Sequence, residues 1–205
     1  MNLSRLEAFS DGVLAVAITL LVLDLHVRPD SPMSLAAQLW QEWPSFAAYG
    51  VSFFVIGVIW VNHHALIRLA VRVDRRLMFY NLLLLSFVSA IPFTTSTLAA
   101  FLQHANQDSQ VAALVYGVSM EGMAISFTLI LTHIIRAGLT AHPIPRTQAR
   151  AAILRFGAGV FVYPLIVIVG LFSAPVMLGL YAILTGFYIF NQTPVLSQSE
   201  NDPER

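Results

Sequence analysis

The sequence contains no cysteine and no lysine among its 205 residues. Without cysteine, the chain can form no disulfide framework, no thiolate metal site and no thiol nucleophile. Charge is also scarce, since Asp, Glu, Lys and Arg make up 11% of the residues, against roughly one quarter in a soluble domain. Hydrophobic residues reach 57%. This composition predicts an integral membrane protein.

The basic residues are all arginines, and they gather at the ends of apolar runs. The chain has 11 basic and 11 acidic residues, so its formal net charge is +0. A nucleic-acid partner is not expected, because these clusters flank apolar segments, where arginine sets membrane orientation. Neither a nucleotide-binding loop nor an extended catalytic insert is visible. Because we find no nucleophile–base pair or metal-ligand group, we do not expect an enzyme.

Apolar runs separated by Pro, Gly and polar residues predict an all-α protein with six transmembrane helices. Ser4 and Glu7 have the spacing of a capping box, which predicts a first helix starting at Arg5. A short interfacial helix is expected over 35–43, since Trp40 and Trp43 suit the headgroup level. The six spans form one predicted domain over 1–192, with a polar tail over 193–205. They cover 5–27, 44–72, 77–103, 110–136, 149–172 and 175–190.

The distribution of arginine predicts the orientation of these spans. The second and fourth loops carry nearly all of the loop arginines, and the other loops contain only Arg28. By the positive-inside rule, both termini, the tail and the even-numbered loops are then cytoplasmic. We expect the first apolar run to be a retained helix, because it begins with acidic residues and lacks a small-x-small cleavage site. The arginines around the two basic loops are Arg68, Arg72, Arg75, Arg76, Arg136, Arg146, Arg150 and Arg155.

The first predicted helix carries an aliphatic stripe. At about 100° per residue, Phe9, Val16, Leu20, Leu23 and Val27 fall within about 40° of one another. Thr19 lies at the edge of that stripe, and Asp11 points away from it, toward the body of the subunit. The stripe fits either lipid contact and helix packing, or a hydrophobic constriction around a symmetry axis.

Asp11 lies at membrane depth, where an ionisable group is costly unless it is paired or hydrated. Candidate partners at a similar depth are Trp60, His63 and His64 in the second span, Asn81 in the third, and Arg5. These residues predict a hydrogen-bond network that locks the first helix to its neighbours. Alternatively, the same network sets the tilt of the first helix and hence the opening of a pore, and a histidine in it would make that opening pH-sensitive. His63 and His64 project about 100° apart and lack a third ligand, so no structural metal site is expected.

Two further acids remain ambiguous at this stage. Asp24 lies near the outer end of the first helix. It either contributes to a ring of carboxylates at an extracellular mouth or is a plain interfacial acid. Glu121, near the middle of the fourth span, is a packed and protonated acid or part of a proton relay. His133 is expected to be structural. Small residues such as Gly117 and Gly170 are expected to let helices approach closely.

One motif connects the chain to a known family. The run Arg5-x-x-x-Phe9-Ser10-Asp11-Gly12-Val13, followed by 17–23 (Ala-Ile-Thr-Leu-Leu-Val-Leu), resembles the signature of the lysosomal potassium channel called transmembrane protein 175. Trp60-x-x-His63-His64 and the segments around Asn81 and Ile91-Pro92-Phe93 support the resemblance. These specific motifs lie within the first ~95 residues, whereas the span count covers the whole chain.

The resemblance implies a bacterial member with one six-helix repeat per subunit, placed in the inner membrane and assembled as a homotetramer. It implies a cation leak channel whose first helix lines the pore, with potassium as the permeant ion and no cofactor. Matched to the motif, the constriction consists of Val16, Leu20 and Leu23, with Thr19 as the polar position. Arg5, Phe9, Ser10 and Asp11 belong to the signature.

Two alternatives remain beside this hypothesis. A proton-coupled secondary transporter or a proton channel would use Asp11, Glu121 and the membrane histidines, although no internal repeat is visible. A non-conducting structural membrane protein is the other alternative, whereas the channel would have membrane lipid and its own copies as partners. The structural protein would show no ion flux after purification and reconstitution.

Overall fold

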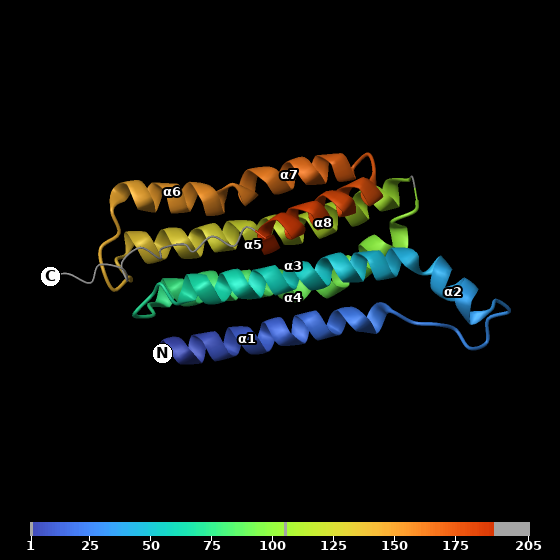
Figure 1. The fold of residues 1–205 in the computed structure, drawn as a ribbon, viewed down its shortest axis with the longest axis horizontal. Coiled ribbons are helices and arrows are strands. Elements are labelled where there is room, and N and C mark those ends of the chain that lie inside the picture. Colours follow the sequence, from blue (N-terminus) through green and yellow to red (C-terminus); the bar gives the residue numbers. More distant parts are fainter. Residues whose placement is uncertain (1, 105, 191–205) are drawn as a thin grey trace.

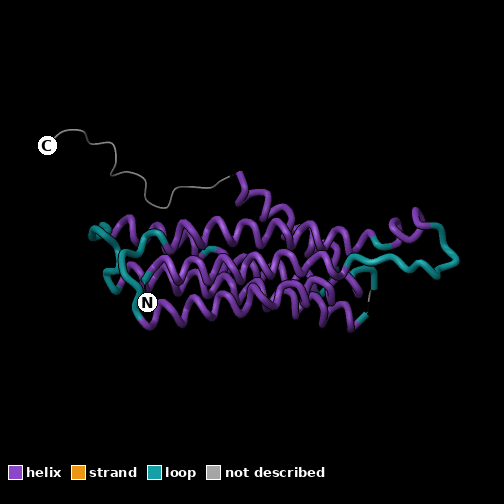
Figure 2. The backbone as a smooth tube through the Cα atoms, turned by 90° about the horizontal axis from the view of Figure 1, so that it is seen from below, coloured by secondary structure: helices purple, strands orange, loops and turns teal. Residues whose placement is uncertain are grey.

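The computed structural model describes residues 2–104 and 106–190 as a single elongated bundle of helices. In Figure 1, α1 forms one edge of the bundle, α3 and α4 follow, and α6 and α7 lie at the opposite edge. Figure 2 shows that the loop after α1, together with α2, extends beyond the end of the bundle. The predicted tail over 193–205 lies outside the described residues.

The first span consists of α1 (Leu3–Leu20) followed by a 3-10 helix, η1 (Leu21–Asp24). The predicted capping box was wrong: the Asn2 side chain caps the helix by accepting from the Arg5 backbone N–H at 3.1 Å. Continuation to Val27 was also wrong, since Leu25 is already extended. The Gln38 side chain accepts from the Arg28 backbone N–H at 2.9 Å, and the following Pro29 disfavours a helical Arg28.

The short predicted helix and the second span are confirmed as α2 (Leu35–Gln41) and α3 (Trp43–Ile67). Ser34 caps α2 by accepting from the Ala37 backbone N–H. Pro44 stands in the first turn of α3, where a missing N–H costs nothing because that group has no helical partner. The second span ends at Ile67, five residues before the predicted limit at Arg72.

The third and fourth spans are α4 (Arg75–Phe101) and α5 (Gln107–Arg136), which pack along one another. Asp74 caps α4 and Asn106 caps α5. After α5, Gly138 has φ +60, a left-handed conformation that favours glycine. The Leu139 N–H then reaches the Ile134 carbonyl at 3.0 Å, which satisfies one of the last carbonyls of α5.

The predicted fifth span is two helices rather than one, α6 (Arg146–Gly157) and α7 (Gly159–Gly170). The interruption falls at Ala158, between two glycines, which are poor helix formers. The last described helix is α8 (Ala174–Phe190). Close packing of α7 on α5 depends on Gly117, because a Cβ there would collide with Val167.

Five helical stretches are long and apolar enough to cross a membrane by length and composition. They cover Leu3–Asp24, Trp43–Ile67, Arg75–Phe101, Gln107–Arg136 and Arg146–Gly170, and the apolar α8 is shorter. In Figure 1, the start of α1 lies at the same end of the bundle as the α3–α4 and α5–α6 loops. The arginine-rich loops therefore share one end with the N-terminus of α1.

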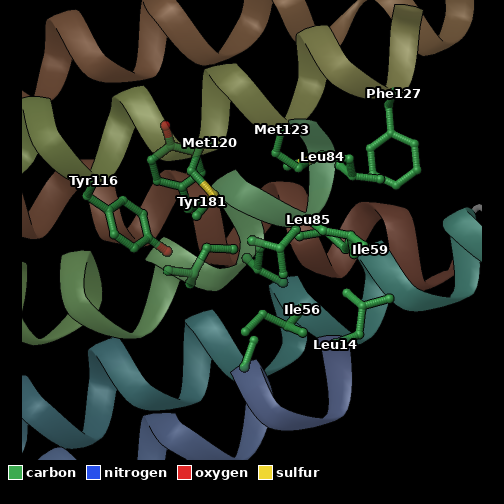
Figure 3. Close-up of a cluster of buried hydrophobic side chains, with 14 of the residues drawn as sticks. Leu14, Ile56, Ile59, Leu84, Leu85, Tyr116, Met120, Met123, Phe127 and Tyr181 are labelled. Carbon is green, nitrogen blue, oxygen red and sulfur yellow. The ribbon is translucent and has the colours of Figure 1, made fainter. Parts of the chain in front are cut away.

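The core lies between α1, α3, α4, α5 and α8. Figure 3 shows Leu14 of α1 beside Ile56 and Ile59 of α3, with Leu84 and Leu85 of α4 behind them. All five side chains are buried. The first helix therefore contributes one apolar face to the core of its own subunit, and this contact orients the rest of its surface.

Candidate functional site

The inner face of α1 packs against α3 and α4. Leu6, Ser10, Leu14 and Ala17 are buried, and Leu21 of η1 continues the same face. Steps of three and four residues place these side chains on one side of a helix. Burial of this face holds α1 in one rotational position relative to the subunit.

The opposite face of α1 is exposed and almost entirely apolar. At about 100° per residue, Thr19 projects about 180° from the centre of the buried face. Val16 is 56% exposed and Leu23 is 70% exposed, and both project to the same side as Thr19. The remaining exposed residues around them are Phe9, Gly12, Ala15, Leu20 and Val22. We call this surface, from Phe9 to Leu23, the outer face of α1.

Thr19 occupies a more central position on this face than the sequence predicted. Its hydroxyl donates to the Ala15 and Val16 carbonyls, both at 2.9 Å. The oxygen lone pairs remain available on the exposed side of the helix, since Thr19 is exposed. The outer face therefore presents one hydroxyl group among aliphatic side chains. Val27, predicted to extend the stripe, follows the end of the helix and does not share its register.

A buried chain of hydrogen bonds connects α1 to α4 and α3. The Asn81 amide donates to Ser10 Oγ at 2.9 Å, and Asn81 Oδ1 lies 2.7 Å from His63 Nε2. Because that oxygen can only accept, His63 Nε2 carries the proton in this arrangement. Ser10 in turn donates to the Leu6 carbonyl at 2.9 Å. All three side chains are at most 1% exposed, so the chain forms a dry polar link.

Asp11 is linked separately, at the rim of the contact between α1 and α3. Its Oδ1 accepts from Trp60 Nε1 at 3.0 Å. Asp11 is half-buried and Trp60 is exposed, so this acid does not point into the subunit core as predicted. The two links, through Ser10 and through Asp11, bind adjacent residues of the signature to different helices.

Other predicted members of the network lie apart from these links. His64 is exposed, and its Nε2 lies 3.5 Å from the Arg68 guanidinium. Arg5 is exposed at the start of α1. Asp24 is half-buried at the end of η1, at the opposite end of the span. Within the described residues, no group of three His, Asp or Glu side chains has metal-binding geometry.

An ion pair at the arginine-rich end was missed by sequence reasoning. His133 Nε2 of α5 lies 2.8 Å from Asp74 Oδ2, and the His133 ring packs against Tyr80. Next to this pair, the Val71 N–H donates to the Leu139 carbonyl at 2.8 Å, so the two basic loops are joined. An Asp just before an apolar run is a helix-cap signal, but no sequence pattern connects it to His133.

Asp74 combines a helix cap with this ion pair, and the two roles can be separated by mutation. Asp74→Ala is expected to lower the free energy of unfolding by about 1–2 kcal/mol, because the cap of α4 is lost. Asp74→Asn is expected to cost about 0.5 kcal/mol, since asparagine caps equally well and only a partly exposed ion pair is lost. Thermal unfolding in detergent measures both. Equal losses for the two variants would contradict the assigned cap.

The same carboxyl gives a pH dependence. Burial alone would raise the pKa of Asp74, but hydrogen bonds from the Leu77 N–H and from His133 lower that pKa below its ordinary 3.8. The stabilisation is therefore fully present above about pH 4 and is lost as the pH falls through the folded-state pKa. The stability of the Asp74→Asn variant should change less over that acidic range.

A second set of buried polar side chains connects α3, α4 and α5. Ser52 Oγ of α3 accepts from the Thr95 hydroxyl of α4 at 2.8 Å and lies 3.1 Å from the Tyr116 hydroxyl of α5. Glu121 lies on α5, and α1 packs instead against α3 and α4. The geometry therefore brings Asn81, His63 and Trp60 to α1, and leaves Glu121 outside that network.

Comparison with known proteins identifies similar chains. The family model described as endosomal/lysosomal potassium channel TMEM175 matches residues 5–92. A potassium channel of Streptomyces collinus is 46% identical over 201 residues, which are 97% of each chain. A potassium channel of Chamaesiphon minutus is 40% identical over 163 residues, covering 77% of this chain and 79% of that one. The crystal structure of a lysosomal potassium-selective channel TMEM175 homolog from Chamaesiphon minutus superposes with TM-score 0.82 at 33% identity. That superposition covers 93% of this chain and 98% of the other.

Proposed function

Because the chain belongs to the family of the endosomal/lysosomal potassium channel TMEM175, we propose that it is a potassium-permeable cation leak channel of a bacterial inner membrane. Members of this family are ion channels, which are membrane proteins. We propose that this protein conducts ions passively. Potassium is the permeant ion of this proposal, and no cofactor takes part.

The observation that carries the proposal is the outer face of α1. A continuous apolar surface on the edge helix of the bundle is exposed in the single subunit, and Thr19 places one hydroxyl among its aliphatic side chains, as suits a hydrophobic constriction. Symmetry would bring this surface from several copies around one axis. We propose a homotetramer whose pore is lined by α1, with six spans per subunit in one channel domain and both termini cytoplasmic.

Within this pore, Val16, Leu20 and Leu23 form the hydrophobic constriction. Such a constriction controls conduction because ions must lose part of their hydration shell where water is excluded. Thr19 supplies oxygen atoms at the same level, and four copies of Asp24 form a carboxylate ring at the outer mouth that attracts cations. Behind the pore, Ser10, Asn81, His63, Asp11 and Trp60 hold α1 in position.

Potassium and sodium flux in proteoliposomes tests this proposal. Val16→Ala and Leu23→Ala should each raise the potassium flux, by about tenfold if a ring of smaller side chains removes about 1.4 kcal/mol of barrier. The ratio of potassium to sodium flux should fall at the same time. Phe93→Ala is the matched control, because Phe93 is 69% exposed on α4 rather than on α1.

Three outcomes would contradict the proposal. Flux that needs a proton gradient and ignores both α1 substitutions would favour the transporter. Absence of flux in wild type and in all variants would favour a structural protein. An effect of Phe93→Ala equal to that of Leu23→Ala would show that α1 does not line the pore.

A further inference from the structure

Glu121 occupies an unusual position for an acid. It is the middle residue of the 30-residue α5, which places it near the centre of the bilayer. It is half-buried and borders an outward surface of α5 formed by Leu114, Val118 and Ile125, all exposed. An open groove of about 450 Å³ between α4 and α5 begins on the same surface. The acid therefore stands at the edge of an apolar face.

The carboxyl of Glu121 lacks the partners that an ionised acid needs. Its Oε2 is buried and has no hydrogen-bond partner within the described residues. Among the described side chains, the acid that forms an ion pair is Asp74, with His133, and not Glu121. A charge without a partner at this depth costs several kcal/mol. Hydration or protonation are the remaining ways to satisfy the group.

Two phenols, from α7 and α8, share the surroundings of Glu121. Tyr163 of α7 and Tyr181 of α8 lie close enough to interact with the charge of Glu121. The Tyr181 hydroxyl is itself buried without a partner, and Tyr181 is 1% exposed. The ring of Tyr181 lies 5.4 Å from that of Tyr116 and 5.8 Å from that of Tyr163, and Figure 3 shows the first pair.

We propose that Glu121 is a proton-binding site of the α5–α7–α8 part of the subunit, separate from the pore network, with a carboxyl that keeps its proton at neutral pH. The neutral acid leaves α5, α7 and α8 free of an unpaired charge. Loss of the proton would place a carboxylate beside the close contact of Gly117 with Val167 and loosen α7 against α5. Alkaline pH is therefore expected to weaken this half of the bundle.

Infrared spectroscopy tests the proton directly. Wild-type protein in lipid nanodiscs at pH 7 is compared with Glu121→Gln, a variant that has the shape of the neutral acid but no acidic proton. The wild-type minus variant spectrum should contain the carbonyl band of a protonated carboxylic acid. If the difference contains only the bands of an ionised carboxylate, the proposal is overturned.

Covalent labelling tests the access of this acid from the bilayer. A lipid-soluble carbodiimide reacts with a protonated carboxyl: the carboxyl oxygen bonds to the central carbon, and the proton moves to a nitrogen. The acyl group then shifts from oxygen to the other nitrogen, so the product retains every atom of the reagent. Mass spectrometry should find this full mass increase on Glu121, and much less of it at pH 9.

Asp30 is the matched control, because it is an exposed acid in the loop before α2. Labelling of Asp30 should stay at least tenfold below that of Glu121, and Glu121→Gln should carry no label on the α5 peptide. Absence of the Glu121 label at pH 7, or equal labelling of Asp30, would overturn the proposal of a protonated carboxyl at the edge of the apolar face. Since neither measurement depends on ion flux, their failure is distinct from failure of the channel proposal.

Discussion

Replacement of Asn81 by leucine is expected to lower the free energy of unfolding by about 1–3 kcal/mol, which corresponds to a drop of roughly 5 °C in the unfolding temperature. Asn81 is fully buried and connects Ser10 on α1 to His63 on α3. Leucine fills a similar volume but leaves the His63 N–H without an acceptor. The lower part of the range applies if each bond contributes only the ~0.6 kcal/mol typical within membranes.

His64→Leu is the matched control for this experiment. His64 follows His63 directly on α3, but it is exposed and contacts only the side chain of Arg68 among the described hydrogen bonds. Its replacement should change the unfolding temperature by less than about 1 °C, since exposed substitutions away from special features are usually near neutral. Thermal unfolding in detergent, followed by intrinsic tryptophan fluorescence, measures both variants. A loss for His64→Leu as large as that for Asn81→Leu would contradict the assigned network.

The two histidines also show how far the sequence could predict this site. Counting residues from the ends of the apolar runs placed Trp60, His63, His64 and Asn81 at the depth of Asp11. Of these residues, Trp60 bonds to Asp11 itself, and His63 bonds to Asn81, which bonds to Ser10. Depth alone does not give the rotation of a helix about its axis. Because neighbouring residues project about 100° apart, one histidine is buried at Asn81 and the other faces outward. Rotation is decided by packing between helices distant in the sequence.

The same limit explains the exchange of roles between Ser10 and Asp11. Because an unpaired acid is costly within a membrane, Asp11 was predicted to point toward partners in its own subunit. The buried hydrogen bond with Asn81 is instead made by Ser10. Asp11 remains at the rim, where Trp60 can reach it and burial is incomplete. A small hydroxyl is the cheaper group to bury, since it can also donate to a carbonyl of its own helix.

Helix existence was predictable, whereas interruptions within apolar runs were not. Apolar runs and the Pro, Gly and polar residues that bound them placed α2 to α5 within a few residues of their observed starts, because strong apolar patterns leave little choice. The break at Ala158 separates the arginine-containing α6 from the apolar α7, and the tighter turn of η1 is a local change of helix geometry at the end of the first span. The ion pair joins Asp74, the N-cap of α4, to His133 in the last turn of α5, and its partners stand 59 residues apart.

Modification of single cysteines is expected to show most directly which residues of α1 line the pore. The native chain has no cysteine, so each introduced thiol is the only one present. Treatment of Leu23→Cys with a positively charged methanethiosulfonate reagent should reduce potassium flux at least about tenfold. Four added positive charges at a narrow ring would repel cations, in the way that rings of Arg or Lys exclude them from pores.

Leu21→Cys supplies the control within the same turn. Leu21 is 1% exposed and packs into the subunit, whereas Leu23 is 70% exposed on the outer face of α1. The reagent should therefore leave the flux of Leu21→Cys unchanged, while Val16→Cys and Thr19→Cys respond in the same direction as Leu23→Cys. Unchanged flux in all four variants, with modification verified by mass, would place the permeation path elsewhere. Because the buried and exposed faces of α1 follow from packing alone, this pattern connects the fold of one subunit to the position of the pore.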